Sequence, residues 1–256
     1  MKTIHYFCTG GETEVGGMQK FLLKINANIN WSRQFPALNK GAKPTRSDVT
    51  SPTMYNAHTG TTGKNLVAKM HKVLKEYSQN FINSDGILLI DDADCRFLDT
   101  DFNAWMNRLQ TDVQTILGKP IPVYVLIASP EVEAWFIADP IHSFEKLYSN
   151  FPGFGHQMSQ YIKNQILCGA HIEQFGGPCI NEACTIKLSN ELINIFSDQD
   201  FLKPFIQLYG IENVKFGLRY SKKTHGAQML EAIEPDIVSS HCNLFFKQTY
   251  QKLAQL

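Results

Sequence analysis

Three apolar stretches of the sequence are each followed closely by carboxylate side chains. These carboxylates are Glu12 and Glu14 after the first stretch, Asp91, Asp92 and Asp94 after the second, and Glu131 and Glu133 after the third. Carboxylates that share a site repel one another, and this raises their pKa values unless a cation lies between them. Mg²⁺ and Mn²⁺ accept such oxygen ligands, and Mg²⁺ keeps waters for substrate phosphates. The pattern therefore predicts a divalent-metal site if the fold brings the three stretches together.

The elements that must position these acids alternate between strands and helices. Apolar runs predict strands over 3–8, 86–91 and 121–129, and helical spacing of apolar residues predicts helices over 16–29, 63–79, 100–117 and 130–139. Residues 31–60 carry prolines, glycines and basic residues without a sustained period, which predicts a long connection. The order β-α-α-β-α-β-α predicts an α/β fold with a mostly parallel sheet flanked by helices.

In an open parallel sheet, ligands bind in the crevice beyond the carboxyl ends of the strands. All three predicted strands are followed by acid, so the carboxylates are expected to converge there. The glycines of "TGGETEVGG" (9–17) predict a tight turn that a phosphate can approach closely. A single acid at such a place is more often a partner of a helix dipole, but three aspartates within residues 91–94 favour the metal site.

The overall charge balance excludes one class of protein. Lys and Arg together number 24, as do Asp and Glu, so the chain lacks the global positive field of a strongly basic nucleic-acid binder. Neither a signal peptide nor a stretch of about 20 apolar residues is recognisable. We expect a soluble, cytoplasmic protein without membrane association.

Cysteine and histidine residues near the middle of the chain offer a second kind of metal site. Cys168, His171, Cys179 and Cys184 have the side chains that tetrahedral zinc uses. Their spacing matches no common zinc finger, so reduced thiols in a partly buried segment are the preferred interpretation and structural zinc is the alternative.

Several motifs resemble the Toprim domain, which topoisomerases, primases and overcoming-lysogenization-defect nucleases share. They are the acidic glycine-containing turn, Asp92-Ala93-Asp94, "EAWFIAD" (133–139), "YSKKTHGAQMLEAI" (220–233) and "FFKQTYQKL" near the end. The last three of these motifs look, more specifically, like those of Toprim-like families encoded beside AAA-type ATPases in bacterial anti-phage loci. The resemblance covers roughly 1–140 and 218–254.

This resemblance implies a Toprim-like, Rossmann-type core over 1–140, a mainly helical insertion over 141–217, and C-terminal helices over 218–256 that return to the core. It also implies a Mg²⁺- or Mn²⁺-dependent nuclease that cleaves phosphodiester bonds, acts in phage defence and has an AAA-type ATPase partner. The implied metal ligands are Glu12, Glu14, Asp92, Asp94 and Glu133, and the implied catalytic residues are Glu12, Asp92, Asp94 and Lys223.

The first motif departs from the family pattern, because Gly10 stands where the family has glutamate. Glu12 is the preferred replacement as general acid or base. Glu14 could replace it instead, or the chemistry could be weakened or lost. For Glu133, the alternative to metal binding is a role as a helix-dipole partner.

Basic residues in two regions are expected to contact nucleic acid. They are Lys222, Lys223 and His225 before the last helices, and Lys43, Arg46 and Lys64 in and after the long connection. One lysine of the first group is expected to contact a phosphate, as the resemblance implies, and a solvated basic face is the alternative.

Two further functions remain open at this point. One is a non-catalytic regulatory or scaffold subunit that keeps the Toprim frame to bind an ATPase, which Gly10 would suit. The other is a phosphotransferase or nucleotidyl transferase that uses the same acids. Metal binding by Asp92 and Asp94 distinguishes the nuclease from the scaffold, and consumption of nucleoside triphosphate identifies the transferase.

Overall fold

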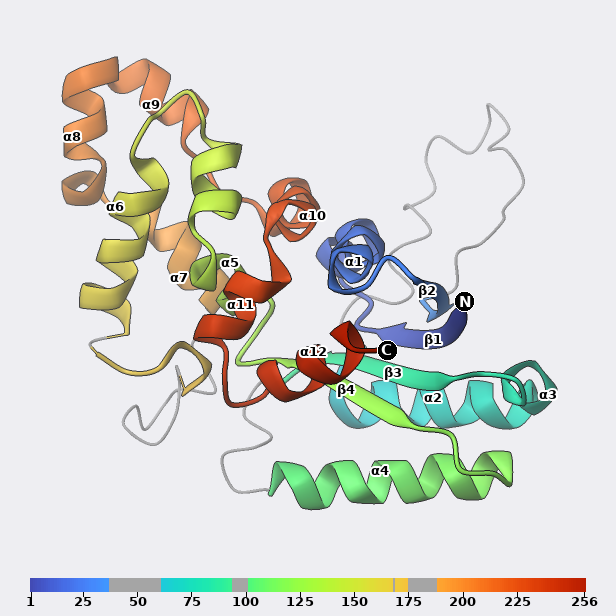
Figure 1. Cartoon of the computed structure of the whole chain (residues 1–256). Coiled ribbons are helices and arrows are strands. Elements are labelled where there is room, and N and C mark those ends of the chain that lie inside the picture. Colours follow the sequence, from blue (N-terminus) through green and yellow to red (C-terminus); the bar gives the residue numbers. More distant parts are fainter. Residues whose placement is uncertain (37–60, 94–100, 168, 175–187) are drawn as a thin grey trace, which may run out of the picture.

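The centre of the protein is a four-stranded parallel sheet. The structure is a computed structural model that describes residues 1–36, 61–93, 101–167, 169–174 and 188–256 (Figure 1). The strands, in the spatial order β2-β1-β3-β4, are β1 (Lys2–Cys8), β2 (Ile29–Phe35), β3 (Gly86–Asp92) and β4 (Val123–Ala128). The predicted α/β fold with a parallel sheet is confirmed.

Both faces of the sheet are covered, which explains the continuous apolar runs in its strands. Side chains of β3 alternate between two buried clusters, with Leu88 and Ile90 in one and Ile87 and Leu89 in the other. This alternation is the two-residue period of a strand. It also decides to which face each aspartate at the end of β3 points.

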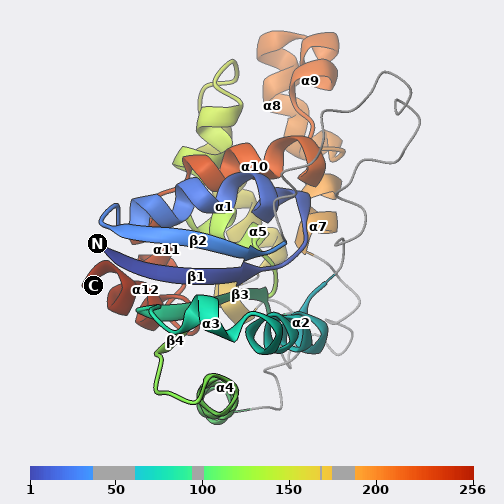
Figure 2. The ribbon, with the colours of Figure 1, turned by 90° about the vertical axis from the view of Figure 1, so that its right-hand side faces the viewer.

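Helices form a layer on each side of the sheet (Figure 2). One face is covered by α2 (Gly63–Glu76), α3 (Ser78–Phe81) and α4 (Phe102–Leu117). The other face is covered by α1 (Glu12–Ile25), α5 (Glu133–Ala138), α10 (Lys222–Ala232), α11 (Pro235–His241) and α12 (Lys247–Ala254). The C-terminal helices therefore return to the sheet, with α10 packed on α1 and α12 against β4.

Between α5 and α10 the chain forms a helical lobe beside the sheet (Figure 1). Its described elements are η2 (Ile141–Glu145), α6 (Phe154–Tyr161), η3 (Ile162–Ile166), η4 (Ile172–Gln174), α7 (Leu188–Ile195), α8 (Gln199–Tyr209) and α9 (Ile211–Gly217). Aromatic rings fill its interior, and Phe154 contacts Tyr148, Phe196, Phe201 and Phe205 at centroid distances of 4.9–5.8 Å.

The buried Glu173 fastens the lobe to the C-terminal helices. Its carboxylate accepts hydrogen bonds from the backbone N–H groups of Leu244, Phe245 and Phe246 at 2.5–3.3 Å. Its backbone carbonyl accepts a bond of 2.7 Å from the hydroxyl of Ser129, just after β4. One residue thus ties the lobe both to the sheet and to the segment that leads into α12.

The structure corrects the prediction for the segment after the first strand. Residues 29–35 form the edge strand β2 rather than the end of a helix and the start of a connection. The helix predicted over 16–29 is α1, which begins at Glu12 and ends at Ile25. Ile29 and Trp31 point inward and Asn30 outward, so the strand period is present but extends over few residues. The rest of the predicted connection, 37–60, lies outside the described residues.

Other predicted elements agree in type and differ at their ends. The predicted helix 63–79 divides into α2 and α3, and the predicted helices 100–117 and 130–139 begin later, at Phe102 and Glu133. Asp101 caps α4 by accepting from the N–H groups of Asn103 and Ala104. Within the described ranges, none of the helices combines the length and the hydropathy that crossing a membrane requires.

A candidate active site at the carboxyl edge of the sheet

All four parallel strands end at one edge of the sheet, and several of the predicted acids meet there. The pairing of Cys8 with Ile90 and of Asp92 with Ala128 places the carboxyl ends of β1, β3 and β4 side by side. Helix α1 begins at this edge (Figure 2). The glutamates of "GGETEVGG" therefore belong to the first turn of a helix, not to the flexible turn that the glycines predict.

Glu14 brings an unsatisfied carboxylate oxygen to this edge. The residue is only 3% exposed, and its Oε2 atom is buried without a hydrogen-bond partner among the described residues. A Cβ atom on Gly11 would lie 2.1 Å from that oxygen, so a larger residue at this position would require the Glu14 carboxylate to move. Burial raises the pKa of Glu14, the Lys222 ammonium opposes this shift, and Glu133 adds to it.

A second unsatisfied group lies near the same carboxylate. Neither the buried Thr9 hydroxyl nor Glu14 Oε2 makes a hydrogen bond of good geometry in the described part of the chain, but the two groups are neighbours, and the hydroxyl acts as a donor that lowers the pKa of the Glu14 carboxylate. Buried polar atoms are normally bonded to protein, water or an ion. The space around Thr9 and Glu14 thus has the polarity that a water molecule or a cation requires.

The two aspartates at the end of β3 have different roles. Asp91 accepts the backbone N–H of Gly63 at 2.9 and 3.2 Å and so binds the first turn of α2. Asp92 points to the opposite face, the one that carries Glu14. Burial raises the pKa of Asp92 well above its usual range, and the negative charges of Glu14 and Glu133 raise it further, against the opposing effect of Lys222. Asp94 lies outside the described residues.

Lys222 forms ion pairs with both acids that follow β4. Its Nζ atom lies 3.4 Å from Glu131 Oε2 and 3.2 Å from Glu133 Oε2. Tyr220 donates its hydroxyl to Glu133 Oε1 at 3.0 Å, and Ser189 donates its hydroxyl to Glu131 Oε2 at 3.1 Å. Both glutamates are buried, and Glu133 is completely inaccessible.

The electrostatics of Lys222 reflect an excess of negative charge. Burial lowers the pKa of Lys222, but Glu133, Asp92, Glu14 and Glu131 together outweigh this effect and raise it above its usual range. Burial also raises the pKa of Glu133, with Lys222 acting in the opposite direction. About a third of the Lys222 side chain is exposed (34%), so the side chain is only partly covered by its carboxylate partners.

The described side chains of the cluster fit a divalent metal ion only in part. Among the described residues, no group of three or more Asp, Glu, His or Cys side chains could hold one, and Lys222 is the cation between Glu131 and Glu133. Mg²⁺, however, is usually bound by one or two carboxylates with waters completing its ligands. The unpartnered oxygen of Glu14 and the neighbouring Asp92 fit this kind of binding.

Close packing between α1 and α10 places Lys222 over the site. The Thr13 hydroxyl donates to the Lys222 carbonyl at 3.3 Å, where α10 begins. A Cβ atom on Gly226 would lie 2.0 Å from the Thr13 Oγ1 atom. A Cβ atom on Gly17 would lie 2.6 Å from the carbonyl oxygen of Ala227. The glycines thus let the two helices approach closely, and this approach is what brings Lys222 to the carboxylates.

We expect Gly17→Ala to destabilise the protein, although alanine normally stabilises a helix by about 1 kcal/mol relative to glycine. The added methyl group would press on the backbone of Ala227, and such overpacking costs about 1–3 kcal/mol. Urea unfolding followed by circular dichroism measures the difference. Gln228→Ala, at an exposed position of α10, is the control and should have little effect. A stabilised Gly17→Ala variant would contradict the close packing.

Apart from Lys222, three of the basic residues predicted to bind nucleic acid lie in the described part of the chain. Lys223 and Lys64 are exposed near the starts of α10 and α2, respectively. His225 packs near the rings of Tyr148 and Tyr220, and burial lowers its pKa. Lys43, Arg46 and the side chain of Glu12 lie outside the described part.

The alternative zinc site cannot be built from described residues. His171 accepts the backbone N–H of Glu173 on its Nδ1 atom at 3.2 Å. Cys168, Cys179 and Cys184 lie outside the described residues. The zinc alternative therefore stays a prediction.

The motif "EAWFIAD" combines a site residue with structural residues. Glu133 belongs to the carboxylate cluster, whereas Asp139 accepts the backbone N–H of Glu234 at 2.8 Å and joins α5 to the start of α11. Trp135 stacks on Phe21 of α1 at a centroid distance of 5.2 Å. The motif thus holds α5 between the site, α1 and α11.

Three site residues were missed or under-weighted by the sequence reasoning. Tyr220 belongs to the motif "YSKKTH", where it could have been considered together with the lysines. Glu131 was recognised only as an acid after a strand. Ser189 has no local signal, because its contact with Glu131 joins residues 58 positions apart.

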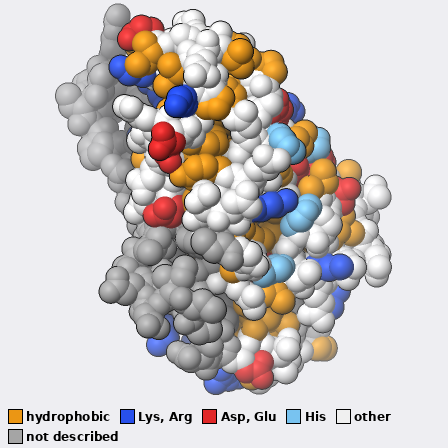
Figure 3. Space-filling model, turned by 90° about the vertical axis from the view of Figure 1, so that its left-hand side faces the viewer, with side chains coloured by type: hydrophobic (Ala, Val, Ile, Leu, Met, Phe, Trp, Pro, Cys, Tyr) orange, Lys and Arg blue, Asp and Glu red, His pale blue; other side chains and the backbone are white. Residues whose placement is uncertain are grey.

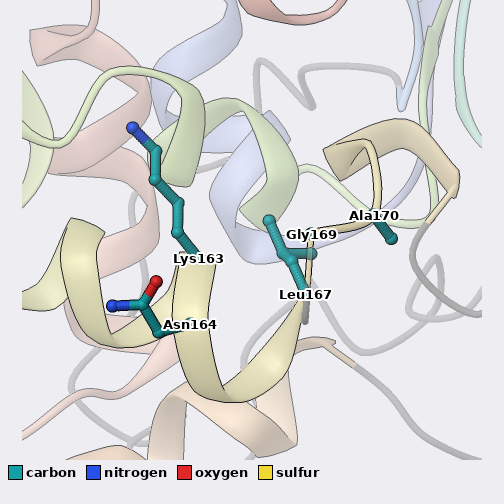
Figure 4. Close-up of a pocket in the computed structure, with 5 residues that line it drawn as sticks. All are labelled: Lys163, Asn164, Leu167, Gly169 and Ala170. Atoms are coloured by element: carbon teal, nitrogen blue, oxygen red, sulfur yellow. The ribbon is translucent and has the colours of Figure 1, made fainter.

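Hollows on the surface of the helical lobe lie apart from this cluster. One of about 570 Å³ is lined by Lys163, Asn164, Leu167, Gly169 and Ala170 (Figure 4). None of these residues belongs to the carboxylate cluster. On the face shown in Figure 3, lysine and arginine side chains are scattered among acidic, histidine and hydrophobic ones, without a broad basic patch outside the grey residues.

The comparisons with known proteins add no constraint on function. The Toprim resemblance depends on the motifs quoted above, while the geometry of the site is independent of it. Protein-family models, curated proteins and solved structures were all compared with the chain, and none of them matches it.

Proposed function

We propose that the protein is a Mg²⁺- or Mn²⁺-dependent nuclease that cleaves phosphodiester bonds in DNA or RNA. One observation carries the proposal: Glu14, Asp92 and Glu133 converge around the partly exposed Lys222 side chain at the carboxyl edge of the sheet, and one Glu14 oxygen makes no hydrogen bond of good geometry among the described residues. This edge is where open parallel sheets bind their ligands.

The charge balance of the cluster supports a bound cation. Four carboxylates act on the single ammonium of Lys222. Burying ionised carboxylates without partners is costly, so an anionic cluster of this kind either takes up protons or binds a cation. Glu14 and Asp92 are the residues that would hold a divalent ion, with Asp94 as a further ligand that the sequence predicts. Glu133, the other predicted ligand, already accepts from Tyr220 and Lys222 on its two oxygens.

The side chains of the site suit hydrolysis of a phosphodiester. A divalent ion would supply a polarised phosphoryl oxygen and a bound water of lowered pKa. Lys222 would contact the phosphate and stabilise the negative charge that develops on it. Burial raises the pKa of Glu14 above its ordinary value, and a raised carboxyl pKa suits a general acid or base.

We therefore propose Glu14 in the role that Gly10 leaves vacant, where the sequence alone favours Glu12. The Glu14 carboxylate extends back over Gly11 toward the end of β1. Assistance by Glu12 and a catalytic contribution from Lys223 remain predictions. The ATPase partner and the role in phage defence follow from the motifs alone, and the nucleic-acid contacts and the cytoplasmic location stay predictions from the sequence.

A second candidate is the non-catalytic scaffold. The observation that favours it is that Lys222 already pairs with Glu131 and Glu133, while the described side chains do not complete a three-ligand metal site. In that case the cluster is an internal ion-pair network and the functional surface lies elsewhere.

Metal titration followed by a cleavage assay separates these two functions. The wild-type protein is titrated with Mg²⁺ and Mn²⁺ while its thermal unfolding is followed, and it is then incubated with plasmid DNA and with total tRNA. The nuclease should gain thermal stability with metal and cut one substrate, and Glu14→Gln should lose both properties. A wild-type protein that neither responds to metal nor cuts either substrate would favour the scaffold.

A further inference from the structure

Glu131 and Glu133, which form ion pairs with Lys222, also accept hydrogen bonds from residues outside the sheet. Glu133 receives the Tyr220 hydroxyl on Oε1 at 3.0 Å and Lys222 on Oε2 at 3.2 Å. Glu131 receives the Ser189 backbone N–H on Oε1 at 3.5 Å and the Ser189 hydroxyl on Oε2 at 3.1 Å. Ser189 lies in the first turn of α7, in the helical lobe, and Tyr220 lies just before α10.

We infer that Ser189 and Tyr220 are positioning residues, which fix Lys222 at the site by orienting Glu131 and Glu133. The consequence for catalysis rests on the proposed nuclease function. The positioning itself concerns only the geometry of Lys222 and can be tested separately.

The inference follows from what a lysine side chain requires. Lysine carries a compact charge on a flexible stem of four carbons, so its position depends on its partners. A carboxylate bound through one oxygen can still rotate, whereas one bound through both oxygens is fixed. Tyr220 and Lys222 occupy both oxygens of Glu133, and Ser189 alone contacts both oxygens of Glu131.

The same contacts give the helical lobe a part in the site. The N-terminal turn of α7 meets the start of α5 through Ser189 and Glu131, at the point where β4 leads into the site. A displacement of α7 would release Glu131 and with it one of the two ion pairs of Lys222. The lobe is thus a structural requirement for the arrangement of the sheet-edge residues.

Chemical labelling of Lys222 tests the inference without any assumption about activity. The metal-free protein is exposed to limited reductive methylation, and modification of Lys222 is quantified by mass spectrometry of peptides, with the exposed Lys215 as internal reference. Tyr220→Phe and Ser189→Ala should each raise Lys222 labelling by about 2- to 10-fold, the factor that corresponds to one lost hydrogen bond. Ser189→Thr should restore the wild-type rate.

A matched control separates positioning from general loosening of the lobe. Tyr161 donates its hydroxyl to a carboxylate of Asp198 at 2.5 Å, away from Lys222. Tyr161→Phe removes the same kind of bond and should leave Lys222 labelling unchanged. If Tyr220→Phe and Ser189→Ala also leave it unchanged while circular dichroism shows folded proteins, the inference is overturned.

The cleavage assay then links positioning to function. If the wild type cuts nucleic acid, the two variants should lower kcat by about 10- to 100-fold, as loss of an outer partner of a site residue does, with little change in KM. Increased labelling together with an inactive wild type would refute the nuclease and leave the positioning intact. Full activity in variants with increased labelling would refute the catalytic consequence.

Discussion

Lys222→Met should lower the free energy of unfolding by about 3–5 kcal/mol, the cost of removing one partner from a buried ion pair. Glu133 is completely buried, and Glu131 is nearly so. Without the ammonium, Tyr220 and Ser189 remain as hydrogen-bond donors, but no cation in the described residues balances these charges. Urea unfolding followed by circular dichroism in metal-free buffer measures the loss. Cleavage should also be lost, because Lys222 is the proposed phosphate contact.

Two companion variants identify the cause of this loss. Lys215→Met, at an exposed position of α9, changes the same side-chain type and should alter stability by less than about 0.5 kcal/mol. Adding Glu133→Gln to Lys222→Met should recover part of the lost stability, since the uncompensated charge is then removed. A single Lys222→Met variant as stable as the wild type would show that the ion pairs contribute nothing and that solvent already screens these glutamates.

The central strands could be predicted because burial on both faces leaves a strong sequence signal. β3 reads "GILLI" before its aspartates, and few other structures accommodate such a run next to acid. β2 was missed for the opposite reason. It lies at the edge of the sheet, and its sequence "INWSRQF" alternates only at Ile29 and Trp31 before polar residues intervene. A signal of that length is weaker than the helical pattern before it.

The site was predicted in part, because the sequence fixes which acids follow each strand but not which way they point. Asp91 and Asp92 have the same surroundings in the sequence, yet the strand period sends Asp91 to the N–H of Gly63 and Asp92 to the cluster. This difference could have been foreseen, since Leu88, Ile90 and Asp92 share one face.

A similar argument from periodicity applies to the two lysines, of which the resemblance implied Lys223 as the catalytic one. In α10, Lys222 shares a helical face with Gly226, Met229 and Leu230, at spacings of four, seven and eight residues. Lys223 lies one residue off this stripe and is exposed. The helical period thus favours Lys222 over Lys223. By contrast, the contact of Ser189 with Glu131 depends on tertiary packing, which no local sequence pattern predicts.

Asp92→Asn should make the metal-free protein more stable at neutral pH while abolishing its response to metal. Burial and the charges of Glu14 and Glu133 raise the pKa of Asp92, so the folded state binds a proton there more tightly than the unfolded state does. This contribution to stability is complete below the ordinary aspartate pKa of about 3.9 and is lost as pH rises through the raised pKa. Asparagine resembles the protonated acid, and each unit of a raised pKa corresponds to about 1.4 kcal/mol at high pH.

The pH dependence of stability and a comparison with Asp91→Asn test the prediction for Asp92→Asn. Urea unfolding measured upward from about the ordinary carboxyl pKa should show the free energy of unfolding falling less steeply with rising pH for Asp92→Asn than for the wild type. Asp91→Asn, one residue away, should instead destabilise the protein by about 1–3 kcal/mol, because Asp91 accepts the N–H of Gly63 and its loss leaves a buried donor poorly paired. Opposite changes in the free energy of unfolding for these two variants would show that Asp91 stabilises the start of α2, whereas the charge of Asp92 serves a bound cation. If Asp92→Asn also destabilised the protein at every pH, Asp92 would be a structural acid and the metal site would lose its central ligand.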